Sequence, residues 1–152
     1  MAAFDPDKTG AADRIVARLV TDESISEPDR ALARAHTKLG LPTFVYHFSY
    51  VPITLRDKSF GLAHGGEISY VFNTPRSGAN WDDEAKGISL AANKYWTAFA
   101  KHGDPGTAGG PKWPAWRSGN ESLIEFGFGG VPVIHKDFHK ARLDWVEQSL
   151  TK

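Results

Sequence analysis

The order of periodic segments along the chain predicts a mixed α/β fold. Four segments have the apolar spacing of amphipathic helices: 11–20, 27–39, 82–101 and 138–150. Three short runs rich in β-branched and aromatic residues have the length of strands: 42–50, 122–126 and 131–135. With 152 residues, of which 41% are hydrophobic, the chain is long enough to bury a core, and we expect residues 1–152 to form a single unit.

Capping residues indicate where the helices begin and end. Ser26 precedes a glutamate, a proline and an aspartate, which predicts a helix capped by Ser26 and stopped by Gly40. Residues 82–101 open with three acidic residues, which the helix dipole favours at an N-terminus, and stop before Gly103. The apolar stripe of this segment runs as far as Phe99, so we expect the helix to pack against a large surface.

Residues 42–50 predict a central strand, because aromatic residues alternate with other bulky residues, among them His47, and both faces would be covered. No period holds from 51 to 66, where three glycines and a proline interrupt a long connection of the kind that carries functional sites. The next run, 67–72, is too short to assign to helix or strand. The last two strand-like runs flank a Gly-Phe-Gly-Gly turn and predict a hairpin.

Composition argues against several classes of function. The 18 lysines and arginines balance 18 acidic residues, so the chain lacks the field that would attract nucleic acid or an anionic membrane. The absence of cysteine excludes disulfides, thiolate metal sites and a cysteine nucleophile, and favours a reducing compartment such as the cytoplasm while leaving export open. Residues 1–21 contain no apolar run of the length that a signal peptide or membrane span requires.

His64 is the principal candidate for catalysis. It stands among small residues in the long connection, and the two glycines that follow it would let substrate and backbone approach the imidazole closely. Because an imidazole titrates near neutral pH, histidine is the usual general base for a serine hydroxyl. From these residues alone, a hydrogen-bonded loop histidine without a catalytic role remains the alternative.

Four motifs occur in a fixed order along the chain. They are the strand-like run 42–48, the segment Ala-His-Gly-Gly-Glu-Ile-Ser-Tyr-Val-Phe at 63–72, the segment Tyr-Trp-Thr-Ala-Phe-Ala-Lys-His-Gly-Asp-Pro at 95–105, and Trp-Pro-Ala-Trp at 113–116. In this order they resemble the type B carboxylesterases, the cholinesterase-like branch of the α/β-hydrolases. The family's histidine motif aligns with the second of them, and its histidine with His64.

The resemblance implies the C-terminal part of an α/β-hydrolase fold, with a few strands of the central sheet and their packing helices. It also implies ester hydrolysis by a Ser-His-acid triad in which His64 is the general base, without metal or cofactor. The family's Gly-x-Ser-x-Gly motif is missing, and the nearest match, 87–91, lies inside a predicted helix. The acid and the oxyanion segment belong to upstream sequence in the family. We therefore do not assign the acid to Asp22, Glu23 or Asp29, which we expect on or before surface helices.

Other polar and aromatic residues receive structural interpretations. Glu67 matches the family's glutamate and is expected to fix the local backbone or a buried arginine. Asp104 is expected to cap a turn. The tryptophans Trp96, Trp113 and Trp116 are expected in the core, the last two clamped beside a proline, rather than in a substrate wall.

The histidines near the C-terminus do not form a convincing metal site. His135 and His139 are four residues apart, but they straddle a strand end and a helix start, and a third ligand is not evident. Nearby, Lys136, Lys140 and Arg142 are expected to form a solvated helix face.

Three functions are compatible with such a chain. The first is a fragment of a serine carboxylesterase acting on small carboxylic esters, which would be inactive alone. The second is a non-catalytic binding or assembly module, since cholinesterase-like domains without catalysis act in adhesion. The third is one chain of a split esterase whose serine and acid come from another chain. An open sheet edge and apolar faces would favour pairing with the rest of an esterase, or self-association.

Overall fold

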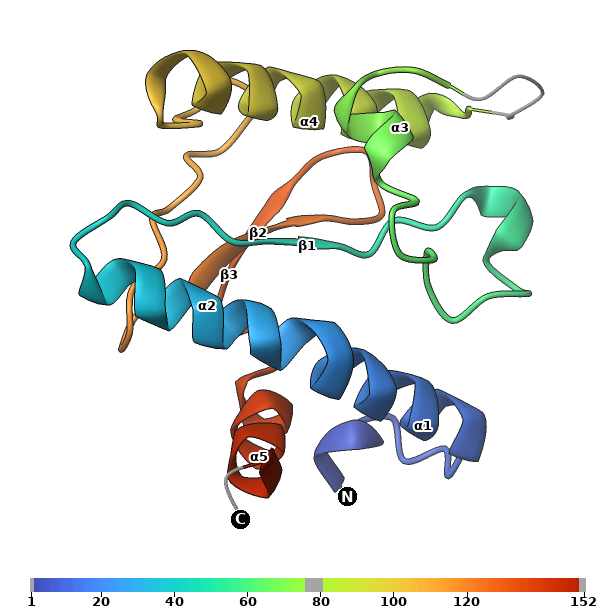
Figure 1. The fold of residues 1–152 in the computed structure, drawn as a ribbon. Helices are drawn as coiled ribbons and strands as arrows, with labels where there is room; N and C mark the ends of the chain where they lie inside the picture. Colours follow the sequence, from blue (N-terminus) through green and yellow to red (C-terminus); the bar gives the residue numbers. More distant parts are fainter. Residues whose placement is uncertain (1, 76–80, 151–152) are drawn as a thin grey trace. The chain divides into compact units, whose positions relative to one another are not determined.

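The computed structural model describes residues 2–75 and 81–150. These residues form two compact units (Figure 1). Unit 1 contains the chain up to residue 43, the segment 116–121 and the chain from 137 onward, and unit 2 contains residues 44–115 and 122–136. Each unit therefore combines segments that are distant in the sequence.

Unit 1 is helical. Helix α1 (Ala12–Thr21) continues through a π-helical turn (Asp22–Ser26) into helix α2 (Glu27–Lys38), and helix α5 (Lys140–Leu150) completes the unit. All three predicted helices in this part of the chain are confirmed. The predicted cap is wrong: Ser26 has helical dihedral angles and its side chain forms no capping hydrogen bond, because the chain is already helical before it.

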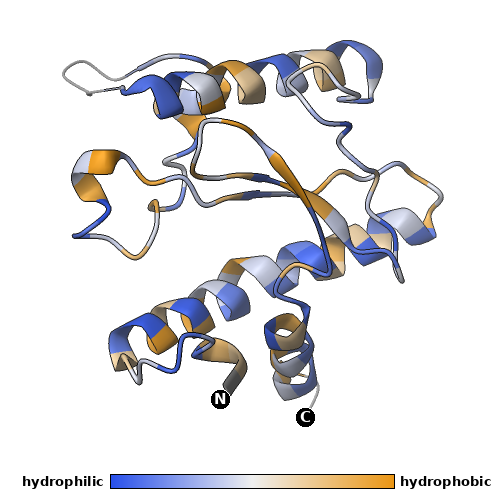
Figure 2. Cartoon of the chain, turned by 180° about the vertical axis from the view of Figure 1, so that it is seen from behind, coloured by the Kyte–Doolittle hydropathy of each residue, from blue (hydrophilic) through white to orange (hydrophobic). Residues whose placement is uncertain are grey.

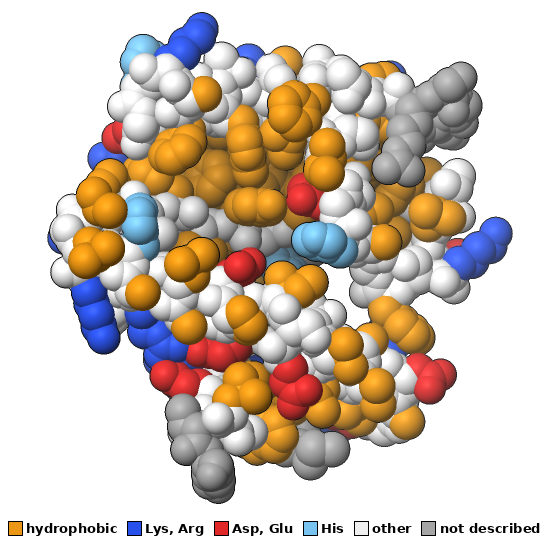
Figure 3. All heavy atoms as spheres, viewed as in Figure 1, with side chains coloured by type: hydrophobic (Ala, Val, Ile, Leu, Met, Phe, Trp, Pro, Cys, Tyr) orange, Lys and Arg blue, Asp and Glu red, His pale blue; other side chains and the backbone are white. Residues whose placement is uncertain are grey.

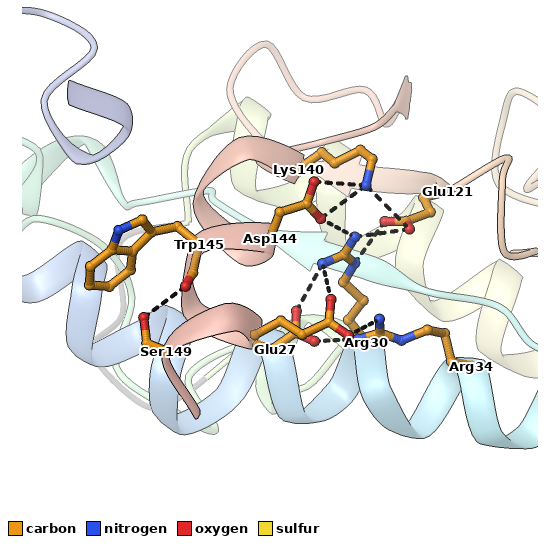
Figure 4. Close-up of polar contacts among 9 residues, drawn as sticks. Glu27, Arg30, Arg34, Glu121, Lys140, Asp144, Trp145 and Ser149 are labelled. Carbon is orange, nitrogen blue, oxygen red and sulfur yellow. Dashed lines mark hydrogen bonds and ion pairs between the residues drawn. The ribbon is translucent and has the colours of Figure 1, made fainter. Parts of the chain in front are cut away.

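A buried arginine joins the helices of unit 1. The Arg30 guanidinium donates to Glu27 at 3.1 Å, to Glu121 at 2.8 and 3.0 Å, and to Asp144 at 2.6 Å (Figure 4). Its side chain is only 6% exposed. Burial alone would lower the pKa of Arg30, but the hydrogen bonds to Glu121, Asp144 and Glu27 outweigh burial and raise it. A single side chain of α2 therefore connects α5 and the 116–121 segment.

A second buried pair corrects two sequence predictions. Arg142 Nε lies 2.8 Å from an oxygen of Asp22, which is 1% exposed. Burial raises the pKa of Asp22 while Arg142 acts against this shift. Asp22 is therefore not a surface residue. Arg142 does not belong to a solvated face either, and Lys140 binds Asp144 at 2.9 Å.

Unit 2 contains a three-stranded sheet with the order β1 (Tyr46–Phe48), β2 (Ser122–Phe126), β3 (Val133–Lys136). Strands β1 and β2 are parallel, and β2 and β3 form the predicted antiparallel hairpin. The prediction of a central strand in 42–50 is wrong for this chain. Regular pairing covers only three of these residues, and β1 lies at an edge of the sheet formed by the described residues.

The long helix α4 (Asp83–His102) covers one face of this sheet. The predicted start and stop are confirmed, because the Asp82 side chain accepts from Ala85 N at 2.8 Å and Gly103 has a left-handed φ of 70°. Figure 2 shows hydrophilic and hydrophobic residues alternating along the helix. Its buried face is completed by rings from other elements: Tyr50, Tyr70, Trp113 and Phe126.

The stripe of α4 is not buried over its whole length. Phe99 is 48% exposed, so the expected burial fails at the C-terminal end, although Phe99 still packs edge-on against Phe44 at 5.9 Å. Tyr46 of β1, 39% exposed, packs against Trp96 at 5.0 Å. Hydrophobic side chains consequently gather at the surface between α4 and β1 (Figure 3).

The network around Arg30 predicts a large effect of one substitution. Arg30→Met should lower the free energy of unfolding by about 3–5 kcal/mol, because it removes both close contacts of Glu121 and leaves the buried Glu27 with Arg34 as its remaining basic partner. Urea denaturation followed by tryptophan fluorescence measures this change. Lys38→Ala, an exposed substitution in the same helix, should change it by less than about 0.5 kcal/mol. Equal effects of the two substitutions would contradict the role given to Arg30.

Candidate functional site

His64 occupies a tight turn between the long connection and helix α3 (Ile68–Val71). Gly66 N donates to Ala63 O at 2.8 Å, which closes a four-residue turn with His64 in its second position. Gly65, in the third position, has a φ of +76°, as a type II turn requires. A side chain at residue 65 would strain this backbone, which explains why a glycine follows the histidine.

Gly66 is required for a different reason. A Cβ atom at this position would lie 2.5 Å from Leu62 Cγ and 2.8 Å from the Ala63 carbonyl oxygen. Leu62 in turn packs against the core of unit 2. The turn that carries His64 therefore packs closely against Leu62, and this contact restricts the position of its backbone.

The long connection is anchored where it leaves β1. Arg56 Nε donates to Val51 O at 3.0 Å, and its NH2 group donates to Glu84 of α4 at 2.6 Å. The guanidinium carbon lies 4.6 Å from the centre of the Phe128 ring. These contacts attach the first part of the connection, including a short 3-10 helix at 53–55, to the N-terminal end of α4.

A buried tyrosine, Tyr50, follows β1 and lies at the same end of α4. Tyr50 is 0% exposed and its hydroxyl donates to Asp82 Oδ1 at 2.9 Å. Burial, followed by the contact with Asp82, raises the pKa of Tyr50. The Ala85 N–H and the Tyr50 hydroxyl hold the pKa of Asp82 below its ordinary value although burial opposes them. The Asp82 carboxylate therefore caps α4 and accepts the Tyr50 hydrogen bond, which is a structural role.

The imidazole of His64 itself is exposed. Within the described part of the chain, no side chain or backbone group forms a hydrogen bond or ion pair with its ring. The structure thus combines a fixed backbone with an imidazole whose two nitrogens are available. In a serine hydrolase one of these nitrogens faces the hydroxyl and the other faces the acid.

Other residues discussed in the sequence analysis stabilise turns, the core or the backbone. Asp104 accepts from Gly106 N at 2.8 Å, which confirms the turn cap. Trp113 and Trp116 are buried, as expected, with exposures of 5% and 3%. Glu67 fixes the backbone through its carbonyl, which accepts from the Tyr70 and Val71 amides of α3, whereas its side chain binds no arginine among the described residues.

One polar cluster escaped the sequence analysis. The Ser49 hydroxyl donates to one oxygen of Glu125, and the other oxygen lies 2.7 Å from His135 Nε2. The carboxylate stands between the hydroxyl and the imidazole, whereas a triad places the imidazole in the middle. This cluster is therefore not a second triad. The sequence analysis noted His135 only as a candidate metal ligand, and spacing does not bring the three residues together, because they come from three different strands or strand ends.

In residues 2–75 and 81–150, no group of three or more His, Cys, Asp or Glu side chains is placed to bind a metal ion. Among the helices of the same residues, none has the length and apolar character needed to cross a bilayer.

Solved esterase structures share this fold. A thermophilic PNB esterase superposes with a TM-score of 0.75 over 95% of this chain and 30% of its own, at 24% identity. A carboxylesterase of Geobacillus stearothermophilus gives a TM-score of 0.73 over 90% of this chain and 29% of its own, at 20% identity. The architecture is that of part of an α/β-hydrolase.

Sequence comparison specifies the family. The model of the carboxylesterase family matches residues 2–144, so this chain belongs to the carboxylesterase family. It is 35% identical to carboxylesterase 1D of Rattus norvegicus over 64% of this chain and 18% of the relative. It is 34% identical to liver carboxylesterase of Sus scrofa over 72% of this chain and 20% of the relative. The chain thus spans about a fifth of the length of these relatives.

The close contact beneath the His64 turn can be tested directly. Gly66→Ala should lower the free energy of unfolding by about 1–3 kcal/mol, because the added methyl group overlaps Leu62 and the Ala63 carbonyl. Gly61→Ala is the matched control, since a Cβ atom there meets nothing within 4 Å. Thermal unfolding of both variants measures the difference. A tolerated alanine at residue 66 would show that the turn is not packed as described.

Proposed function

We propose that this chain is the C-terminal part of a serine carboxylesterase and that His64 is the general base of its Ser-His-acid triad. The observation that carries the proposal is the exposed, unengaged imidazole held on a fixed turn, together with membership of the carboxylesterase family. In this role Nε2 removes the proton of the serine hydroxyl during attack on the ester carbonyl. The imidazolium then returns the proton to the leaving alcohol.

The nucleophile and the acid are assigned to the rest of a longer esterase. The nearest sequence match to a nucleophile turn centres on Ser89, whose side chain is 0% exposed and donates to Tyr70 O at 2.8 Å. A hydroxyl buried in the middle of a helix cannot reach a substrate, whereas the family's serine sits on an exposed strand-to-helix turn. Ser89 therefore cannot supply the hydroxyl that His64 would deprotonate.

A second candidate, assembly with a separate chain, is supported by exposed apolar residues. Leu32 of α2 is 67% exposed, and Leu39, the residue that follows the last turn of the helix, is 74% exposed. Large apolar side chains left in water favour association with the rest of an esterase, with a complementary chain or with a second copy. In the split-esterase version, the partner supplies the serine and the acid.

One prediction of this proposal concerns the chain alone. Purified protein should not react with a fluorophosphonate probe, and its hydrolysis of p-nitrophenyl butyrate should equal that of the His64→Gln variant, because no activated serine is present. Gel fluorescence and absorbance at the nitrophenolate band measure the two quantities. A probe adduct on any serine of this chain would overturn the fragment interpretation.

Another prediction concerns a chimera in which the serine and the acid are present. Residues 2–144 can replace the matching segment of a carboxylesterase that supplies its own serine and acid. In this chimera, His64→Gln should lower kcat by about 10⁴-fold or more, as loss of a triad member does. Steady-state kinetics on the same ester measures the change.

The matched control for the chimera is His102→Gln, which alters an exposed histidine at the end of α4. This substitution should leave kcat within about twofold, since surface changes of this kind have small effects. A His64→Gln chimera that keeps the activity of the His102→Gln chimera would refute the assignment of the general base.

A further inference from the structure

We propose that Ser89 and Asn93 of α4 are positioning residues for His64. The inference rests on the proposed function for its importance in catalysis. Its structural content, that two side chains of α4 hold the turn carrying His64, can be tested without any esterase activity.

The two side chains satisfy the last carbonyl groups of α3. The Ser89 hydroxyl donates to Tyr70 O at 2.8 Å, and Asn93 Nδ2 donates to Val71 O at 2.9 Å. A helix of four residues leaves its C-terminal carbonyl groups without partners inside the helix. Tyr70 and Val71 are buried, so Asn93 supplies the Val71 carbonyl with a partner in place of water, and Ser89 supplies the Tyr70 carbonyl with a donor in addition to Asn73 N at 3.1 Å.

A continuous series of backbone hydrogen bonds connects these carbonyl groups to His64. Val71 N donates to Glu67 O at 3.0 Å, and Ile68 N donates to Gly65 O at 3.3 Å. The turn is then closed by the bond from Gly66 N to the residue before His64. Fixing the C-terminal end of α3 therefore fixes the orientation of α3, and with it the turn at its N-terminal end.

Ser89 makes a second contact that supports this role. The side-chain amide of Asn73, the second residue after α3, lies 3.0 Å from the same hydroxyl. Asn73 has a φ of +52°, a left-handed conformation that Asn adopts more readily than most residues. Ser89 thus binds both the end of α3 and the reversal that follows it, from a position with 0% exposure.

The test uses the 152-residue chain with the substitutions Ser89→Ala and Asn93→Asp. The first removes a donor to Tyr70 O, and the second replaces a donor to Val71 O with an acceptor. Hydrogen exchange followed by NMR should show the amides of Gly66, Ile68 and Val71 exchanging about 10- to 100-fold faster, the range that loss of one buried hydrogen bond produces. The amide of Ile124, in the sheet, should exchange as in the parent chain.

A spectroscopic readout separates positioning from general stability. In each variant the imidazole resonances of His64, assigned with His64→Gln, should shift or broaden, while those of His36 in unit 1 stay in place. Ile124→Val destabilises the core of unit 2 without removing a hydrogen bond to α3, and it should leave the His64 resonances unchanged.

The outcomes distinguish the two proposals. If the turn amides keep their protection in both variants, or if Ile124→Val moves the His64 resonances as much as Ser89→Ala does, the positioning role is overturned. Asn93 is only half-buried, so Asn93→Asp provides the test should Ser89→Ala fail to fold. Loosening of the turn together with an active His64→Gln chimera would support the positioning contacts and refute the general-base assignment.

Discussion

Burial of the apolar face of α4 is the constraint on which the rest of unit 2 depends. Ile88, Ala92 and Tyr95 are fully buried against the rings of Trp113 and Phe126, which reach the helix from a loop and from β2. Fully burying a large apolar side chain such as that of Ile88 stabilises by roughly 1.5–3 kcal/mol. The residues that pack with this face come from segments that are far apart in the sequence. The long connection, α3 and the hairpin are then placed by contacts with a single rigid element.

This arrangement explains how a histidine can be exposed and still well placed. The backbone around His64 is defined by a left-handed glycine, by the close contact between Gly66 and Leu62, and by α3. The imidazole makes no hydrogen bond to other described residues and is available on its outer side. A triad histidine needs a fixed backbone position, and it also needs both ring nitrogens, one for the serine hydroxyl and one for the acid that orients the ring.

The sequence predicted features that are set by local chemistry and missed those set by distant partners. Helix α4 was predicted with its correct ends because Asp82 and Gly103 act on their own neighbours. The His64 turn was identified through motif resemblance, since spacing alone left an ordinary loop histidine open. The ion pairs of Arg30 with Glu121 and Asp144 join residues 91 and 114 positions apart, so no local pattern reveals them. Strand β1 was predicted as central because its composition suits a strand covered on both sides, whereas the described sheet leaves it at an edge.

Helix α2 shows the opposite of the usual amphipathic arrangement, and this bears on the proposed function. Its charged residues Glu27 and Arg30 are buried in unit 1, while Leu32 and Leu39 face solvent. Buried ion pairs of this kind contribute little net stability, because desolvation offsets most of their attraction. An exposed apolar stripe contributes none until another surface covers it. The exposed leucines fit the proposal made above, in which further parts of an esterase cover the second face of this helix while unit 1 covers the first.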